Sequence, residues 1–412
     1  MTTFKIEHQC PQCGAPAELT ETDRLVQCGF CRVKSYLHAP AGVFRYLLPD
    51  RAPAGTELIY VPYWRFKGMC FSCYPGGMDK RFADVTRQAI ATHHFPVHLG
   101  FRSQTQKLRF AVGRPEGVFL KPRLSKTDLV AELNQRFRAN LRKPVLHQAQ
   151  IGETLSLLYA PFYLKERLMD AVLNEPVPTG SAEGVAPFLD DHEPPKWPID
   201  FIATLCPQCG WDLHGTSDAL ALTCDNCQTV WWARKGRLER LPTHFVAGET
   251  QDNVYMPFWR IQADVTGVAL KSYADLIRVA NLPKVAQPGM DTQPFYFWTP
   301  AFKVRPHRFL SFGAHVTAAQ PAAEQTAGYP PRSATVHGVN LSIQEAVESL
   351  KLLLAVFVRP RKRLEEVLQT MQIKARRYRL VYLPFEEGHH EWIHRDMLLA
   401  INKNLLSHAR RM

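Results

Sequence analysis

Aromatic residues recur at four places along the chain in the order aromatic, any residue, proline, aromatic. The segments read YVPYW, YAPFY, YMPFW and YLPF, and they begin at Tyr60, Tyr159, Tyr255 and Tyr382. Aromatic side chains favour the pleated, half-buried surface of a strand, whereas proline cannot donate a hydrogen bond within a sheet. Each segment therefore predicts a strand that is an edge, or that has a bulge or a strand start at its proline. We expect the aromatic rings to pack in a core, with a ligand groove as the alternative.

Two other segments have the pattern of a capped helix. LSKTDLVAELNQRF begins at Leu124, and LSIQEAVESLKLLL begins at Leu341. In each, a serine stands three positions before an acidic residue, as in a capping box: Ser125 with Asp128, and Ser342 with Glu345. We therefore predict one capped helix in each half of the chain.

The segments follow the same order twice, which indicates an internal repeat. The strand at 59–68 matches that at 254–263, FPVHLGFRS (95–103) matches FWTPAFKVR (297–305), and the last strand at 157–168 matches 380–393. Each half thus reads as a cysteine-rich segment, two strands, a helix and a final strand. The order predicts an α+β fold with two mostly antiparallel sheets, each packed by helices and related by internal duplication.

Cysteine pairs with metal-binding spacing precede the strands of each half. CPQCG occurs twice, and each copy is followed after 13 residues by a second CxxC pair. Four thiolates from two such turns can surround one metal ion as a tetrahedron, and the glycine permits the left-handed backbone that the turn needs. The candidate ligands are Cys10, Cys13, Cys28, Cys31, Cys206, Cys209, Cys224 and Cys227.

These motifs resemble the zinc-ribbon family, in which CPxCG is the usual first turn. The resemblance covers residues 4–48 and 201–243, and it implies two structural zinc ions, each held by four cysteines. Zinc ribbons occur in transcription factors, helicases, ribosomal proteins and scaffold proteins, so the resemblance does not fix a function. The alternative metal is iron, as in rubredoxin, but rubredoxin usually repeats CPxCG at its second turn. Here the second turns read CGFC and CDNC.

Domain boundaries follow from these patterns and from a proline-rich acidic stretch between the halves. We expect a zinc ribbon at 1–48, an α+β domain at 49–175, a linker at 176–198, a second zinc ribbon at 199–245 and a second α+β domain at 246–412. Linkers of such composition cannot bury enough apolar surface to fold alone.

Composition and charge indicate the compartment and the class of partner. All ten cysteines lie in CxxC pairs, no apolar leader precedes the first pair, and the longest apolar run (352–358) is too short to span a bilayer. We therefore expect a soluble, cytoplasmic protein.

The formal net charge is +12, with basic stretches at 102–143 and 359–379. Such stretches suit a polyanion, an anionic lipid or an acidic protein, or they are simply solvated surface.

Two short motifs suggest further chemistry. HEWIH at 390–394 matches the HExxH pattern of zinc proteases, which needs both histidines on one helical face and a third ligand. No acidic residue follows Asp396 and Ala400 occupies a common third-ligand position, so we interpret the match as chance.

Cys70 and Cys73 form a lone CxxC, which we interpret as small buried apolar residues. A redox pair, or a third metal site with His93 or His94, is the alternative.

An aromatic and basic cluster follows the last cysteine pair, and it has two interpretations. It comprises Trp231, Trp232, Arg234, Lys235 and Arg237. These side chains either stack on bases and neutralise phosphates or form an apolar strand that ends in a basic turn.

The sequence as a whole favours a non-enzymatic zinc-binding adaptor or scaffold that binds other proteins. The alternatives are a nucleic-acid-binding protein and an accessory subunit of a redox or membrane-associated complex. The oligomeric state stays open.

Overall fold

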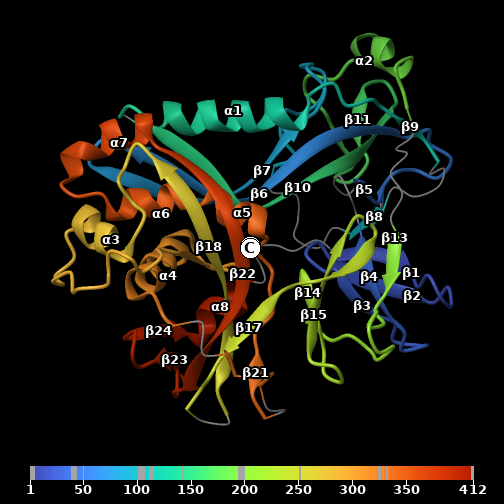
Figure 1. Ribbon diagram of the computed structural model, residues 1–412. Coiled ribbons are helices and arrows are strands. Elements are labelled where there is room, and N and C mark those ends of the chain that lie inside the picture. Colours follow the sequence, from blue (N-terminus) through green and yellow to red (C-terminus); the bar gives the residue numbers. More distant parts are fainter. Residues whose placement is uncertain are drawn as a thin grey trace.

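The computed structural model of the chain is a mixed α and β structure with two large sheets (Figure 1). It describes residues 5–38, 44–49, 51–100, 107–110, 116–141, 143–193, 200–249, 252–322, 326–327, 329–330 and 333–409. The two large sheets belong to the two halves of the chain, and two further sheets have three strands each.

The first large sheet is built on three long antiparallel strands, β6 (Ile59–Tyr74), β7 (Gly77–Gln88) and β10 (His147–Leu164). Helix α1 (Lys126–Ala139) crosses this sheet and covers one face of it (Figure 1). The helix buries Leu129, Leu133 and Phe137, which share an apolar cluster with Trp64 and Phe66 of β6.

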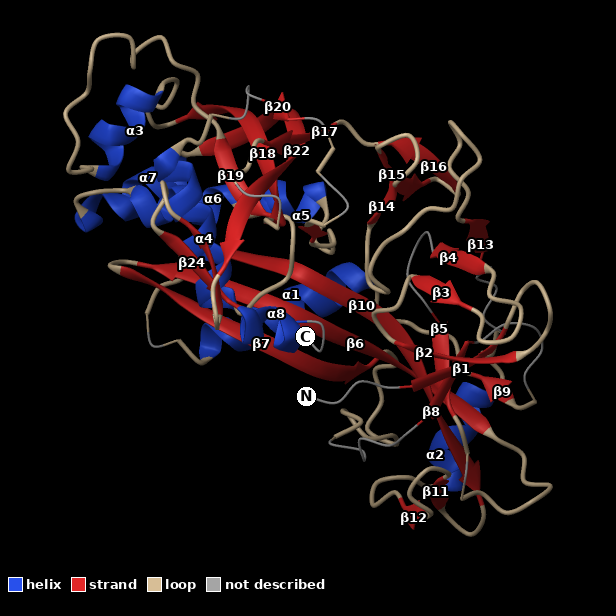
Figure 2. Ribbon diagram, turned by 90° about the horizontal axis from the view of Figure 1, so that it is seen from below, coloured by secondary structure: helices blue, strands red, loops and turns tan. Residues whose placement is uncertain are grey.

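The second large sheet is built on β18 (Val254–Thr266) and β22 (Gln372–Glu387), with β19 (Phe297–Pro300) on the far side of β18. Figure 2 shows α4 (Pro306–Ala319), α5 (Ile343–Glu348) and α6 (Leu350–Phe357) between its strands and those of the first sheet. Phe71 of β6 lies 6.4 Å from Phe309 of α4, ring centre to ring centre, and both belong to one large core. The two halves therefore share a core.

The other elements of the two halves are shorter. In the first half they are β5 (Phe44–Leu47), β8 (Lys107–Phe110), β9 (Val118–Phe119), β11 (Leu168–Asp170), β12 (Glu175–Pro176) and α2 (Ala182–Leu189). In the second half they are β17 (Thr243–Val246), α3 (Tyr273–Ala280), β20 (Thr326–Ala327), β21 (Thr335–Val336), α5 (Ile343–Glu348), α6 (Leu350–Phe357), α7 (Leu364–Thr370), β23 (Glu391–His394), β24 (Leu399–Asn402) and α8 (Lys403–Ala409). A 3-10 turn at Arg361–Arg363 precedes α7.

The long strands of the two halves pair in the same register. Pro62 of β6 lies opposite Tyr159 of β10, and Pro257 of β18 lies opposite Tyr382 of β22. In addition, β5 runs parallel to β10 as β17 does to β22, and β9 runs parallel to β6 as β21 does to β18. The long strands thus have the same pattern of neighbours in both halves.

The prolines lie where a neighbouring strand ends and another begins. On the side of β6 away from β10, β9 pairs as far as Tyr60 and β7 pairs from Tyr63, so the strand pairings leave a gap at Pro62. The same gap occurs at Pro257, between β21 and β19. A residue without an N–H group is tolerated there because no ladder hydrogen bond is lost.

Both predicted helix starts are confirmed. Ser125 caps α1 and Ser342 caps α5, and in each case serine and acidic residue satisfy both bonds of the capping box. The second predicted helix is divided, because α5 ends at Glu348 and α6 starts at Leu350.

One predicted correspondence between the halves is wrong. Phe297 of β19 lies opposite Ile261 of β18, and the matching position in the first sheet is Val85 of β7, opposite Phe66. The counterpart of 297–300 is therefore the end of β7 and not FPVHLGFRS at 95–103. Residues 95–100 form no strand, and 101–106 lie outside the described residues. The proline of that segment instead offers its carbonyl oxygen to the Tyr63 hydroxyl, at 2.8 Å.

The stretch expected to be a linker (176–198) is largely folded onto the first half. β12 pairs with β11, and α2 is capped by Ser181. Val177 and Val185 are buried in the apolar cluster of the first half. The proline-rich composition predicted a linker, but the segment also contains apolar residues whose burial stabilises it against the first half. Residues 194–199 lie outside the described part.

No helix within the described ranges is long and apolar enough to cross a membrane.

Candidate metal centres

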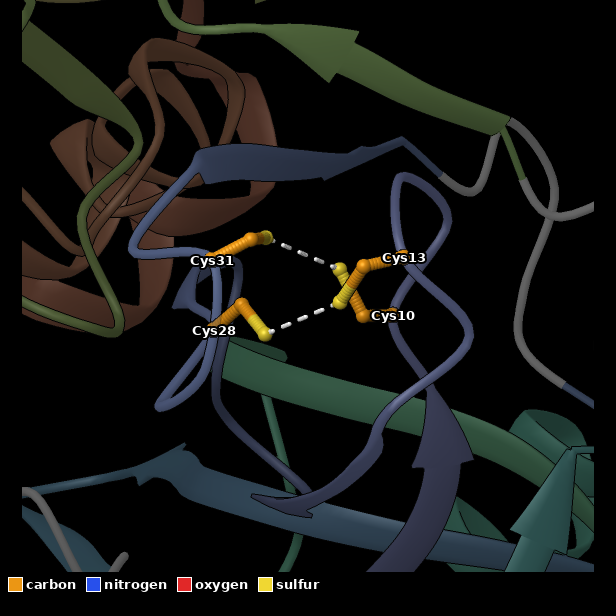
Figure 3. A group of neighbouring side chains, drawn as sticks. All are labelled: Cys10, Cys13, Cys28 and Cys31. Carbon is orange, nitrogen blue, oxygen red and sulfur yellow. Dashed lines mark hydrogen bonds between the residues drawn. The ribbon is translucent and has the colours of Figure 1, made fainter.

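The first cysteine group joins two tight turns of the N-terminal module. This module comprises β1 (Lys5–Gln9), β2 (Pro16–Thr20), β3 (Leu25–Gln27) and β4 (Lys34–His38). Cys10 and Cys13 lie between β1 and β2, and Cys28 and Cys31 lie between β3 and β4. Figure 3 shows the two pairs facing each other across a small gap.

Backbone hydrogen bonds close each turn. The N–H of Gly14 donates to the carbonyl oxygen of Cys10 at 2.9 Å, and the N–H of Arg32 donates to that of Cys28 at 3.0 Å. Both donors have left-handed backbones, with φ of 71° at Gly14 and 60° at Arg32. Glycine adopts this conformation without strain, which explains the first turn, whereas the second turn imposes it on an arginine.

The second cysteine group has the same construction. Its module comprises β13 (Asp200–Ala203), β14 (Ala221–Cys224), β15 (Thr229–Arg234) and β16 (Arg237–Arg240). Gly210 and Gln228 close its turns, with N–H to carbonyl distances of 2.8 Å to Cys206 and 2.9 Å to Cys224. Their φ values are 73° and 57°.

The sulfur positions fit a single ion in each group. Cys10 and Cys31 have their Sγ atoms 3.8 Å apart, and Cys13 and Cys28 have theirs 3.6 Å apart. In the second group the distances are 3.5 Å for Cys206 to Cys227 and 3.4 Å for Cys209 to Cys224. A tetrahedron of sulfurs about 2.3 Å from an ion has edges of about 3.8 Å. All four ligand atoms of each group lie within 4.8 Å of one another, so each group could hold a metal ion.

Local hydrogen bonds favour the thiolate form of one cysteine in each group. The backbone N–H groups of Cys31 and Phe30 lower the pKa of Cys28 to about 6. The side chain of Asn226 and the backbone N–H of Trp211 lower the pKa of Cys209 to about 6. The thiolate is the form that binds metal, so these contacts prepare Cys28 and Cys209 to bind a cation.

The two modules are joined into one unit. β13 of the second module pairs antiparallel with β4 of the first, and Ile202 lies opposite Tyr36. The carbonyl oxygen of Ser217 accepts hydrogen bonds from the N–H groups of Arg24 and Leu25, at 2.6 and 2.8 Å. Tyr36 also packs in the apolar cluster of the second module. The sequence gives no sign of this pairing, because the strands are more than 160 residues apart.

Cys70 and Cys73 lie on opposite faces of β6. Cys70 belongs to the apolar cluster under α1, and Cys73 belongs to the core shared by the two halves. Burial raises the pKa of Cys73 to about 12. Residues three apart on a strand point in opposite directions, so these thiols cannot form a redox pair in this strand. Among the described residues, the two four-cysteine groups are the only sets of three or more close metal ligands. His93 and His94 belong to neither group, so they form no third metal site with Cys70 or Cys73 there.

HEWIH lies in a strand and a turn. Glu391–His394 forms β23, directly after His390. The extended backbone from Glu391 to His394 does not form the helical face that the HExxH pattern needs. His390 and His394 therefore cannot bind one ion in the way that the motif requires.

The tryptophans after the second cysteine group serve packing. Trp231 is buried, and its indole N–H donates to Thr229 Oγ1 at 2.8 Å. The Trp232 ring lies 6.4 Å from the Trp259 ring and thereby connects the second module to β18. Arg234 and Arg237 both contact Glu239, at 3.8 and 3.2 Å. The geometry favours the interpretation of this segment as an apolar strand that ends in a basic turn.

A buried ion cluster connects the first module to the first sheet, and it has no signal in the sequence. Glu21, in the turn after β2, contacts Arg65 of β6 and lies 3.5 Å from Arg45 of β5. Asp84 of β7 lies 2.9 Å from Arg65 on another side. The side chains of Glu21, Arg45 and Arg65 are all 5% exposed or less. A glutamate in a turn ordinarily lies in solvent, so its burial follows only from the contact of module and sheet.

No protein-family model, no curated protein and no solved structure matches this chain.

Proposed function

We propose that this protein is a non-enzymatic adaptor whose two zinc-binding modules present apolar side chains to partner proteins. The observation that carries the proposal is the exposure of large apolar residues around the cysteine turns. Phe30 is 70% exposed, Trp211 57%, Leu205 53% and Val33 42%. Aromatic residues exposed on a rigid scaffold are favourable anchors for a protein interface.

Zinc is the metal that suits these modules in the proposal. Four thiolates in a closed tetrahedron are typical of structural zinc, and they leave no coordination position for a substrate. The ion would hold together a module with few core residues and so fix its exposed turns. The strand conformation of HEWIH supports the non-enzymatic part of the proposal.

The repeated pattern of strand pairing supports an origin by internal duplication. The shared register at Pro62 and Pro257, and the matched capping boxes at Ser125 and Ser342, extend over both sheets. In this proposal each half consists of a zinc ribbon followed by an α+β unit.

Affinity purification from native cells with quantitative mass spectrometry tests the adaptor role. We expect proteins recovered with the wild-type chain to be lost with the double variant Phe30→Ser, Trp211→Ser. The matched control is Val285→Ser, Leu398→Ser, because both residues are 87% exposed apolar residues away from the modules. Equal recovery with both double variants would contradict the proposal, as would a purification without any partner.

A further inference from the structure

The matched registers of the two sheets allow one position to be compared in both halves. Arg65 of β6 lies opposite Ser156 of β10, and Arg260 of β18 lies opposite Arg379 of β22. Since Pro62 and Pro257 are equivalent, Arg65 and Arg260 are equivalent too. Their surroundings differ in charge.

In the first half, carboxylates surround the arginine. Asp84 Oδ1 accepts a hydrogen bond from Arg65 Nε at 2.9 Å, and Asp84 Oδ2 accepts one from Nη2 at 3.0 Å. Glu21 of the first module contacts Nη1. The chain therefore supplies its own anions at this position, and Arg65 is 4% exposed.

In the second half, neither carboxylate has an acidic counterpart. Tyr296, one residue before β19, takes the position of Asp84, and the Arg260 guanidinium lies 3.7 Å from the centre of its ring. Glu21 precedes Cys28 by seven residues, and the residue seven before Cys224 is Ser217. The residues at these two equivalent positions, Tyr296 and Ser217, are thus uncharged.

On the same surface, β22 has arginines where β10 of the first half has uncharged residues. Thr154 and Ser156 of β10 correspond to Arg377 and Arg379, which lie opposite Gln262 and Arg260. Among the described residues, neither Arg377 nor Arg379 has an ion-pair or hydrogen-bond partner for its side chain. Arg376 contacts Asp264. A cleft of about 460 Å³ lies here, lined among others by Arg260, Tyr296, Arg376, Arg377, Tyr378 and Arg379.

The strand beneath these arginines has an open edge. Between Gln372 and Arg379, β22 pairs with β18 alone, and β17 joins its other side only from Leu380. Within the described ranges no strand covers that side. Tyr378 is 41% exposed there. An open edge presents unpaired backbone groups that an extended peptide can bind as a further strand.

We propose that the edge of β22 at 372–379 binds an extended acidic segment of a partner protein. The segment adds a strand to the second sheet, and its carboxylates contact Arg377 and Arg379 as Glu21 contacts Arg65 in the first half. Arginine binds carboxylates through two parallel hydrogen bonds, which gives such a contact direction as well as charge. This inference rests on the proposed adaptor function, for which it names the class of partner.

A peptide fits this surface better than a nucleic acid does. The anion at the equivalent position of the first half is a carboxylate, and the open strand edge offers hydrogen-bond groups that match a peptide backbone. Nucleic acid would use the arginines but would leave the edge unpaired.

Fluorescence anisotropy with the full chain tests the proposal. The probe is a labelled eight-residue peptide of alternating glutamate and threonine, with lysine-threonine and alternately N-methylated peptides and a 20-nucleotide oligothymidine as comparisons. We expect the acidic peptide to bind and the lysine peptide not to bind. Arg377→Glu, Arg379→Glu should weaken binding at least tenfold. Lys362→Glu, Arg363→Glu makes the same charge change at exposed residues outside the cleft and should alter binding less than twofold.

Several outcomes would overturn the inference. These are no binding of the acidic peptide, equal binding by both double variants, or equal binding of the N-methylated peptide, which cannot form the strand bonds. Binding of oligothymidine through Arg377 and Arg379 in place of the acidic peptide would assign the surface to nucleic acid. Circular dichroism and a thermal melt establish that the variants fold. Partner proteins that are recovered with the wild-type chain and lost with Phe30→Ser, Trp211→Ser would support the adaptor role even if the acidic peptide does not bind. Failure of the peptide proposal can therefore be distinguished from failure of the adaptor proposal.

Discussion

The indole N–H of Trp259 donates a 2.9 Å hydrogen bond to the backbone carbonyl oxygen of Leu341, just before the capped helix α5. Trp64 makes the matching bond of 2.7 Å to Leu124, just before α1. In each half, therefore, one tryptophan of a long strand fixes the start of the capped helix against the sheet.

Replacing either tryptophan by phenylalanine should destabilise the protein. Each change removes one hydrogen bond and leaves a carbonyl group poorly satisfied, which costs about 1–3 kcal/mol. Trp259 is 1% exposed and Trp64 is 7% exposed, so we expect the larger loss for Trp259→Phe. Urea unfolding of both variants measures this, with Trp211→Phe at an exposed site as the control. Equal stability of all three would contradict the expectation.

Each cysteine group should hold one metal ion. We expect elemental analysis of the freshly purified chain to find two zinc ions, and Cys13→Ser or Cys209→Ser to leave one. Three thiolates cannot complete the tetrahedron, so the affected module should unfold locally. Cys70→Ala lies outside both groups and should retain two ions. A content of one ion or none in the wild-type chain would refute the assignment, and a majority of iron would favour the rubredoxin-like alternative.

Removing the charge of Glu21 should lower the free energy of unfolding. Glu21→Gln leaves Arg45 and Arg65 buried without their shared anion, and loss of one partner of a buried ion pair costs about 3–5 kcal/mol. The control is Glu239→Gln. The arginine partners of Glu239 are 42% and 74% exposed, so loss of these ion pairs should lower the free energy of unfolding by less than about 1 kcal/mol. Denaturant unfolding compares the two variants. Similar stabilities would show that the Glu21 cluster contributes little.

The protein should lose stability on mild acidification, partly through His147. Burial, together with the nearby charge of Lys351, lowers the pKa of His147 to about 4. The unfolded chain takes up this proton near pH 6.5, whereas the folded chain does not until about pH 4, so stability falls as pH falls between these values. His147→Gln should reduce the loss between pH 7 and pH 5 by roughly 1–2 kcal/mol. Parallel urea titrations at both pH values measure the difference, and an unchanged pH dependence would exclude this role of His147.

The histidines of HEWIH should be dispensable for metal binding. His390→Ala, His394→Ala should leave the metal content unchanged, because the strand Glu391–His394 does not place the two histidines on one helical face. Glu391→Gln should likewise leave any measured activity of the protein unchanged. Loss of one ion in the double histidine variant, or loss of a hydrolytic activity in Glu391→Gln with stability intact, would overturn this interpretation.

The sequence by itself determined the features that depend on neighbouring residues. The four ligands of each cysteine group come from two short turns of fixed spacing, so the groups could be predicted without any knowledge of the fold. The capping boxes at Ser125 and Ser342 are equally local, and the aromatic and proline positions predicted the long strands. Each of these features depends on backbone conformation within a few residues, which composition and spacing control directly.

Only the tertiary structure decided how these pieces meet. The pairing of β13 with β4, the burial of Glu21 between module and sheet, and the packing of Val185 in the first half all join residues far apart in the chain. Such contacts depend on the total apolar surface that many elements bury together, which no local pattern encodes. For the same reason, the sequence showed a basic stretch at 359–379, but the register of β22 against β18 was needed to align Arg377 and Arg379 with Arg260 over an open strand edge.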